Sequence, residues 1–198
     1  GLLCKPLELG ADFSIQALTK YVGGHSDGFM GSVTARTPEG LRQLDHAIAQ
    51  FGWSVGADDA YQMLRGLRTL PTRLAAHGAA AIAAAEWLVG HPAIADVICP
   101  ALPGFGGHGL WRRDCRGQNG LLTIELATRA VGAGEVFLDH LELFGLGFSW
   151  GGYESLALLC DPQLAESPGW RARGAVVRLH MGLEDVGDLI GDLSRALD

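Results

Sequence analysis

The sequence lacks the usual spacings of metal-binding and redox-active residues. Its four cysteines never form a Cys-x-x-Cys pair, and its seven histidines never form a His-Glu-x-x-His pattern. We therefore expect neither a metal site nor a dithiol redox motif. The cysteines are expected to be reduced thiols, as they are in the cytoplasm.

A long hydrophobic run is also missing. The longest run, Ala79–Val89, contains Glu86 and is shorter than the roughly 20 apolar residues that a membrane span needs. It therefore predicts a buried helix. The chain shows no basic start followed by a cleavage site, so we expect no secretory signal. These absences predict a cytoplasmic protein without a membrane partner.

Charged residues make up only 19% of the chain and form no basic cluster. The net charge of −7 argues against a nucleic-acid partner, because such a protein needs a clustered basic face to displace counterions from phosphates. Hydrophobic residues make up 48%, which excludes a disordered polar chain. The sequence predicts a mildly acidic globular protein with a sizeable core.

The first part of the chain combines short glycine-punctuated segments with two helical stretches. A strand is expected at 29–35, and Thr37-Pro38-Glu39 is typical of a helix start, because a capping residue precedes a proline in the first turn. A long helical stretch follows at 57–89. Pro71 should kink or divide it.

After residue 90, strands and helices are expected to alternate. We expect strands at 96–99, 121–127, 145–150 and 175–181, helices at 134–144, 153–160 and 184–197, and a surface loop at 108–113. This order predicts an α/β unit from about residue 70 onward.

Lys20 lies between an apolar segment and the glycine-rich loop 23–28. Lysine is rarely buried without a reason, and an amine that is partly withdrawn from water can act as a nucleophile or a base. The simpler alternative is a surface lysine whose aliphatic stem packs on Tyr21. These residue types alone leave both interpretations open.

The longer string around Lys20 carries a family resemblance. Thr19-Lys20-Tyr21, followed after two residues by Gly24-His25-Ser26-Asp27, resembles the Schiff-base segment of the Cys/Met-metabolism pyridoxal-phosphate enzymes. The resemblance implies that Lys20 holds pyridoxal 5'-phosphate covalently and that Thr19 helps hold the phosphate. Ala17 stands where many family members carry a serine.

A second segment, Ser149-Trp150-Gly151-Gly152-Tyr153, resembles an active-site segment of the same family. By residue type alone, it could equally be a turn with a half-buried tryptophan. The resemblance implies that Ser149 and Trp150 line the substrate pocket near the amino-acid carboxylate. The Trp-Gly-Gly-Tyr version is most similar to bacterial cystathionine β-lyases.

A third segment places Arg178 in an apolar strand. Val177, Leu179 and Met181 should face one side and Arg178 the other, because side chains alternate along a strand. An arginine among apolar neighbours needs an anionic partner, and a carboxylate matches its planar fork. An internal Asp or Glu could be that partner. The resemblance instead implies that Arg178 binds the substrate α-carboxylate.

The resemblance also implies a fold and a domain organisation. It predicts the fold-type I, aminotransferase-like α/β architecture, of which this chain is the C-terminal half. Residues 1–66 would be a remnant of the large cofactor domain, and residues 67–198 a complete small α/β domain. Cofactor-binding residues that the family carries upstream would be missing, so this piece alone is expected to be inactive.

The implied activity is that of a carbon–sulfur lyase. It would cleave cystathionine by β-elimination into homocysteine, pyruvate and ammonia, a step of methionine biosynthesis. A related γ-synthase, γ-lyase or sulfhydrylase, or a non-catalytic fragment, remains an alternative. Intact family members are homotetramers that act on small amino-acid substrates, so the same is expected of the intact protein.

Overall fold

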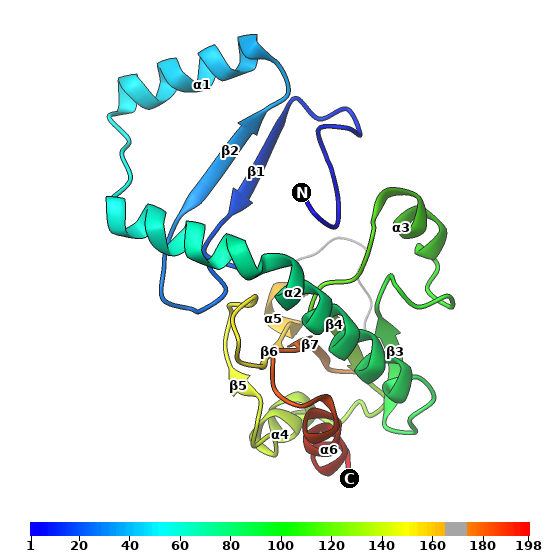
Figure 1. Cartoon of the computed structure of the whole chain (residues 1–198). Coiled ribbons are helices and arrows are strands. Elements are labelled where there is room, and N and C mark those ends of the chain that lie inside the picture. The colour runs from blue at the N-terminus through cyan, green and yellow to red at the C-terminus, as the bar shows by residue number, and fades with distance from the viewer. Residues whose placement is uncertain (165–173) are drawn as a thin grey trace.

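The computed structural model describes residues 1–164 and 174–198, in which one long helix joins a hairpin to a five-stranded sheet (Figure 1). The strands are β1 (Phe13–Ala17), β2 (Gly31–Ala35), β3 (Ile94–Ile98), β4 (Leu121–Leu126), β5 (Gly145–Leu146), β6 (Leu156–Leu159) and β7 (Val176–His180). The helices are α1 (Pro38–Phe51), α2 (Ala57–Leu88), α3 (His108–Asp114), α4 (Ala133–Asp139), α5 (Asp161–Leu164) and α6 (Val186–Leu197).

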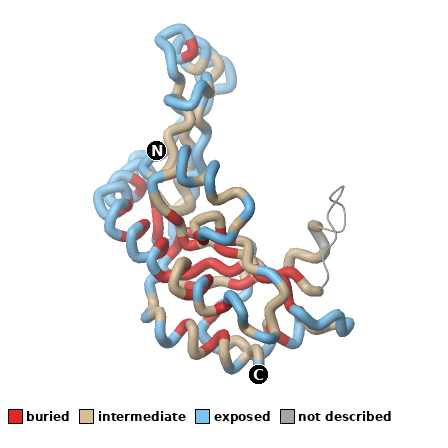
Figure 2. Tube along the Cα trace, turned by 90° about the vertical axis from the view of Figure 1, so that its right-hand side faces the viewer, coloured by how far each residue is buried: buried red, intermediate tan, exposed pale blue. Residues whose placement is uncertain are grey.

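The N-terminal part consists of the antiparallel pair β1–β2 and helix α1. Thr37 caps α1 as predicted, because its side chain accepts a hydrogen bond from the Gly40 N–H at 3.1 Å. This part extends away from the rest of the molecule and is mostly exposed (Figure 2). Large apolar side chains lie open on it, among them Ile15 at 79% exposure and Phe29 at 90%.

Helix α2 joins the two parts and runs unbroken for 32 residues, so Pro71 does not divide it. Leu70 and Leu74 are buried on either side of the proline, and this packing keeps the helix continuous although proline cannot donate a backbone hydrogen bond. The predicted boundary between residues 66 and 67 falls inside this helix. None of the helices in the described ranges has the length and apolar content needed to span a membrane.

The sheet has the order β3-β4-β7-β6-β5, and all its neighbours are antiparallel except β5 and β6. One face packs on the C-terminal half of α2 and on α6. The core formed there includes Ala81, Ala84, Ala85, Leu88, Leu122, Ile124, Val177, Leu179, Met181, Leu189 and Leu193. The predicted inward face of the strand that carries Arg178 is therefore confirmed, as is the α/β class of this part.

The helix predicted at 153–160 is wrong, because Leu156–Leu159 form strand β6 between β5 and β7. A short apolar run of this length fits a buried strand as well as a helix, so its pattern did not decide between them. Ser155 fixes the start of β6. Its N–H and its hydroxyl both donate to the Glu184 carboxylate, each at 2.8 Å.

Other predicted elements differ in length. Helix α4 ends at Asp139 because the buried Asp192 carboxylate accepts the backbone N–H groups of residues 142–144 and so holds that segment outside the helix. The strand expected at 145–150 is reduced to β5. Residues 108–114 form helix α3 rather than a loop.

Three rings meet where the N-terminal part contacts the sheet: Tyr21, His77 of α2 and His180 of β7. The Tyr21 centroid lies 5.5 Å from that of His77 and 5.8 Å from that of His180, and the two imidazoles are 5.2 Å apart. The Tyr21 hydroxyl accepts the Gly120 N–H at 3.0 Å. Burial raises the pKa of Tyr21 to about 12, so the phenol stays protonated at neutral pH.

His180 holds a loop by its unprotonated nitrogen. The Gly151 N–H lies 3.0 Å from His180 Nε2, and because a backbone N–H can only donate, Nε2 must accept. The ring is fully buried, and burial is the main reason that the pKa of His180 is lowered to about 4. The neighbouring His77 lowers it further, whereas the Gly152 carbonyl, Glu154 and Glu184 oppose the shift.

This burial predicts a loss of stability in mild acid. Below pH 6.5 the unfolded chain protonates His180, but the folded protein does not until about pH 4, so the free energy of unfolding falls as the pH falls through this window. The expected loss is about 2 kcal/mol by pH 5 and none above pH 7. Urea unfolding of wild type and His180→Gln between pH 7.5 and 4.5 measures it. Parallel profiles for the two proteins would contradict the assignment.

Candidate active site

Lys20 lies in a tight turn directly after β1. Its N–H donates to the Ala17 carbonyl at 3.2 Å, and its own carbonyl accepts the Gly24 N–H at 2.8 Å. The chain contains only one other lysine, Lys5, whose ammonium pairs with Glu8 at 2.7 Å. Lys20 forms no such ion pair within the described residues, and its side chain is partly exposed.

The buried Arg73 of α2 fixes this turn. Its Nη1 donates to the Tyr21 carbonyl at 2.7 Å, and its Nη2 donates to the carbonyls of Val22 at 3.2 Å and Gly66 at 2.7 Å. A Cβ on Gly24, whose φ is +71°, would lie 2.0 Å from Arg73 Nη1. Glycine at this position therefore lets the guanidinium reach the turn.

Our sequence interpretation missed Arg73. A signal was present, because this arginine lies one turn after the apolar residue Leu70 and directly before Leu74. It is only 7% exposed, and burial lowers the pKa of its guanidinium. The argument applied to Arg178, that an arginine among apolar residues needs acceptors, would have identified it as well.

The structure brings Lys20 together with both residues predicted from the second segment. The Lys20 Nζ donates to the Ser149 hydroxyl at 2.9 Å and lies 4.4 Å from the centroid of the Trp150 ring. An ammonium over an indole face is held by the ring's quadrupole. Trp150 is also half-buried in a turn, as the simpler interpretation proposed. The role of Ser149 and Trp150 in lining a substrate pocket stays a prediction.

Arg178 lies near the same indole, with its guanidinium carbon 5.2 Å from the Trp150 centroid. Its Nη2 donates to the carbonyls of Phe148 at 2.9 Å and Ser149 at 3.1 Å. Its Nε is buried and has no hydrogen-bond partner. No Asp or Glu among residues 1–164 and 174–198 pairs with it, so the internal carboxylate that we considered is not found there.

Thr19 is engaged inside its own loop. Its hydroxyl donates to the Met30 carbonyl at 3.2 Å and accepts the Met30 N–H at 3.0 Å. These two bonds join the ends of the loop that begins at Lys20. To donate to a phosphate, the hydroxyl must release the Met30 carbonyl, so the phosphate role of Thr19 stays a prediction.

Gly151 packs directly on the backbone next to Lys20. Its φ is +86°, and a Cβ at this position would lie 2.7 Å from the Tyr21 nitrogen and 2.9 Å from the Lys20 carbonyl carbon. No other residue fits this approach without displacing the turn. Beside it, the Ser26 hydroxyl donates to the Glu154 carboxylate at 2.7 Å, a second contact between the two segments that we did not anticipate.

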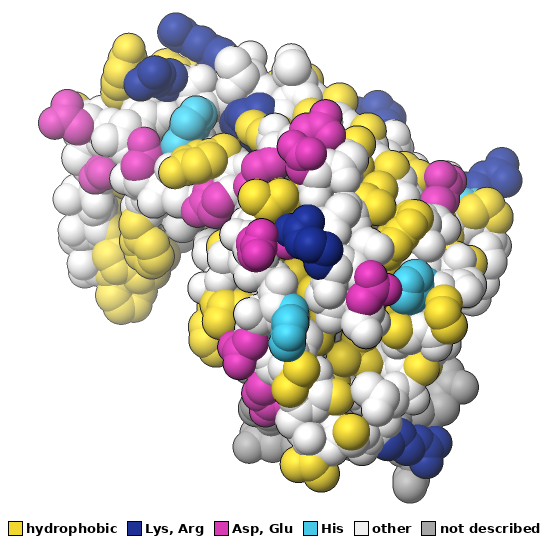
Figure 3. All heavy atoms as spheres, turned by 90° about the horizontal axis from the view of Figure 1, so that it is seen from below, with side chains coloured by type: hydrophobic (Ala, Val, Ile, Leu, Met, Phe, Trp, Pro, Cys, Tyr) yellow, Lys and Arg dark blue, Asp and Glu magenta, His cyan; other side chains and the backbone are white. Residues whose placement is uncertain are grey.

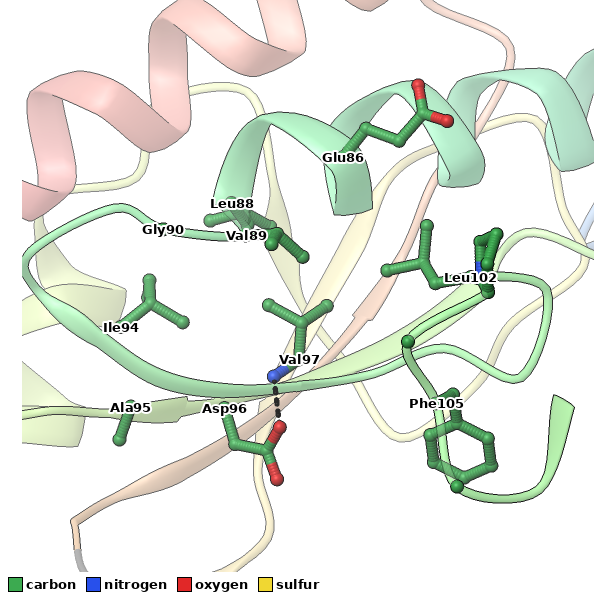
Figure 4. Close-up of a pocket in the computed structure, with 13 residues that line it drawn as sticks. Glu86, Leu88, Val89, Gly90, Ile94, Ala95, Asp96, Val97, Leu102 and Phe105 are labelled. Atoms are coloured by element: carbon green, nitrogen blue, oxygen red, sulfur yellow. Dashed lines mark hydrogen bonds between the residues drawn. The ribbon is translucent and has the colours of Figure 1, made fainter.

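A pocket of about 650 Å³ lies elsewhere, between the end of α2, strand β3 and residues 102–106 (Figure 4). Val97 and Leu102 point into it, whereas the carboxylates of Glu86 and Asp96 extend away from each other at its margins. None of the predicted site residues lines this pocket. We therefore define the candidate site by the reactive and charged side chains around Lys20 and not by this pocket.

The arrangement combines an amine, a hydroxyl, an indole and a guanidinium. The amine can bond covalently to an aldehyde carbon, and the guanidinium with its unpartnered buried Nε suits a carboxylate. These residues therefore fit a pyridoxal-type cofactor together with an amino acid. Within the described ranges, no group of three or more His, Cys, Asp or Glu side chains is placed to hold a metal ion.

Comparison with known proteins supports this interpretation. The chain is 46% identical over 200 residues to cystathionine β-lyase of Bordetella avium and covers 50% of that protein. It is 45% identical over 200 residues to cystathionine β-lyase of Escherichia coli, where 98% of this chain covers 50% of the relative. The chain thus spans about half the length of the curated relatives it matches.

A solved structure shows the same fold. Cystathionine γ-synthase from Xanthomonas oryzae, in complex with aminoacrylate and cysteine, superposes with a TM-score of 0.91 at 36% identity. The match covers 99% of this chain and 52% of that one. The fold-type I architecture is therefore confirmed. All residues, 1–198, match the family described as Cys/Met metabolism PLP-dependent enzymes, and the chain belongs to that family.

Proposed function

We propose that the intact protein is a pyridoxal-phosphate-dependent lyase that converts cystathionine to homocysteine, pyruvate and ammonia. The observation that carries the proposal is the position of the Lys20 amine, 2.9 Å from the Ser149 hydroxyl and over the same indole that Arg178 approaches. An amine and an anion-binding group that both lie near one ring match the two ends of an amino acid. Cofactor attachment through Lys20 is part of this proposal.

Lys20 has two tasks in this scheme. Its Nζ would hold the cofactor by a covalent bond, and as a free amine it would remove the proton from Cα of the substrate. The pyridine ring, when bound, serves as the sink for the electrons of that bond. Ser149 hydrogen-bonds the same Nζ and so directs the amine toward the substrate.

Arg178 and Trp150 orient the substrate. The Arg178 guanidinium is held against the carbonyls of residues 148 and 149, which limits its freedom before a carboxylate arrives. A carboxylate fixed at this point sets the direction of the Cα–H bond relative to Lys20. Such positioning lowers the barrier by holding the reacting atoms in place beforehand.

Two observations favour β-elimination over the related reactions. Trp150 and Tyr153 form the Trp-Gly-Gly-Tyr segment typical of bacterial β-lyases. The identity to the two β-lyases is 46% and 45%, against 36% to the γ-synthase. The alternatives are a γ-synthase, γ-lyase or sulfhydrylase, and a piece that contributes only assembly surfaces when separated from the rest of the protein.

The proposal also covers the cellular location, the oligomeric state and the pathway of the enzyme. We infer a cytoplasmic homotetramer that acts on a small amino acid in methionine biosynthesis. The open apolar side chains of the N-terminal part, such as Ile15, Phe29 and Phe51, support contact with further protein surface. On the face shown in Figure 3, acidic side chains are scattered among apolar ones, and basic side chains form no continuous patch.

Product analysis tests the reaction. Incubating the intact holoenzyme with cystathionine should yield pyruvate and homocysteine in equal amounts, because β-elimination breaks the bond between sulfur and the three-carbon fragment. Chromatography of the keto acids measures this. Formation of α-ketobutyrate and cysteine would instead establish a γ-lyase and overturn the β-lyase assignment. Absence of any keto acid in the holoenzyme would overturn both.

Substitution of Arg178 tests substrate orientation. Arg178→Ala should lower kcat/KM about 100-fold, mainly through KM, since two charge-assisted hydrogen bonds contribute roughly 1.5–3 kcal/mol each before relaxation of the site. Arg178→Lys should recover only part of this, because an ammonium cannot form the planar fork. Arg42→Ala, on the exposed face of α1, is the control. Unchanged kinetics of Arg178→Ala would contradict the role.

A further inference from the structure

Cys4 and Cys115 lie directly opposite each other in an antiparallel bridge, although 110 residues separate them in the sequence. Both are free thiols and partly exposed. Cys4 belongs to the segment that precedes β1, and Cys115 follows the last turn of α3 in an extended conformation. The bridge joins the N-terminal part to the sheet-forming part at a point outside the candidate active site.

The type of bridge suits a disulfide. The Arg116 N–H donates to the Leu3 carbonyl at 2.7 Å, so the residues flanking the two cysteines are hydrogen-bonded and the cysteines themselves form the non-hydrogen-bonded pair. In such pairs the Cα atoms are about 4.5 Å apart and the side chains approach most closely. That spacing falls within the range of roughly 4.4–6.8 Å that a disulfide requires.

We propose that Cys4 and Cys115 form a reversible disulfide that locks the N-terminal segment onto the connection between α3 and β4. The oxidant is a low-molecular-weight disulfide of the glutathione class. One thiolate attacks it, forming a mixed disulfide and releasing one thiol. The second cysteine then attacks the protein-bound sulfur and releases the second thiol. Two cysteine protons pass to the two departing thiolates, so atoms and electrons balance.

The surroundings give the reaction an order. Burial, the Cys4 thiol and Asp114 raise the pKa of Cys115. The raised pKa lowers the thiolate fraction of Cys115, so this thiol is the less favoured first nucleophile and attacks second, on the mixed disulfide at Cys4. No other pair of cysteines in the described ranges is bridged in this way, since Cys99 is buried in the core and Cys160 lies in the sheet region after β6.

The link would stabilise a contact beside Lys20. From Cys4 the chain runs into β1 and the Lys20 turn, and from Cys115 it runs to Gly120, whose N–H donates to the Tyr21 hydroxyl. A covalent bond between Cys4 and Cys115 joins the two chain segments that lead to Tyr21 and Gly120, and so keeps these two residues in contact. The bond would also close a loop of roughly 110 residues, a length at which cross-links restrict the unfolded chain strongly.

Thiol counting and peptide mapping test the proposal. Intact protein incubated with excess oxidised glutathione should lose two of the four thiols of this chain, and non-reducing mass spectrometry should find the Cys4 and Cys115 peptides linked. Dithiothreitol should reverse both changes. Cys160→Ser is the matched control and should form the same link, whereas Cys4→Ser and Cys115→Ser should retain only a mixed disulfide with glutathione.

A second readout measures the consequence of the link. The oxidised protein should unfold about 5–10 °C higher than the reduced protein, and this shift should vanish in Cys115→Ser. Glutathione adducts without the intrachain link, links that involve Cys99 or Cys160, or four thiols that survive the oxidant would each overturn the proposal. Equal unfolding temperatures of the linked and reduced forms would overturn the locking role.

Discussion

The backbone contact between Gly151 and the Lys20 turn is the constraint on which the candidate site depends. A Cβ at Gly151 would lie 2.7 Å from the Tyr21 nitrogen. The backbone of the loop that carries Ser149 and Trp150 therefore packs directly against the turn that carries Lys20. His180 also holds this loop, because its Nε2 accepts the Gly151 N–H. The Lys20 amine meets the Ser149 hydroxyl because both backbones are fixed at this point.

Two arginines stabilise this contact in the same way. Arg73 donates to the carbonyls of the Lys20 turn, and Arg178 donates to the carbonyls of the Ser149 loop. Each therefore satisfies backbone acceptors that would otherwise be left unpaired beside the site. Arg178 differs because its Nε is buried without a partner, which leaves it a donor for an anion. The same residue type thus serves structure in one case and substrate binding, as we propose, in the other.

The sequence was sufficient for features that depend on local pattern or on long motifs. The Thr37 cap of α1 and the inward face of β7 follow from residue types and their order. The association of Lys20 with Ser149 and Trp150 was expected only from the family resemblance of their segments. Strand β6 was mistaken for a helix because four apolar residues have no distinct period. Only the neighbouring strands in space decide their conformation.

Contacts between distant residues could not be predicted in the same way. The bridge between Cys4 and Cys115 and the hydrogen bond from Gly151 to His180 join segments whose spacing has no motif. Arg73 is an intermediate case, since its apolar setting was visible but its carbonyl partners were not. Predicting the arrangement of side chains around Lys20 therefore requires both the sequence motifs and the fold.

Chemical labelling of the lysine tests the central claim most directly. The intact protein is mixed with pyridoxal phosphate, reduced with borohydride and digested, and the labelled peptide is identified by mass spectrometry. The two lysines of this chain provide an internal comparison, because Lys5 is paired with Glu8 and Lys20 faces Ser149 and Trp150. Attachment of the cofactor to Lys20 predicts a stoichiometric label on Lys20 and none on Lys5. An unlabelled Lys20, or equal labelling of both lysines, would contradict it.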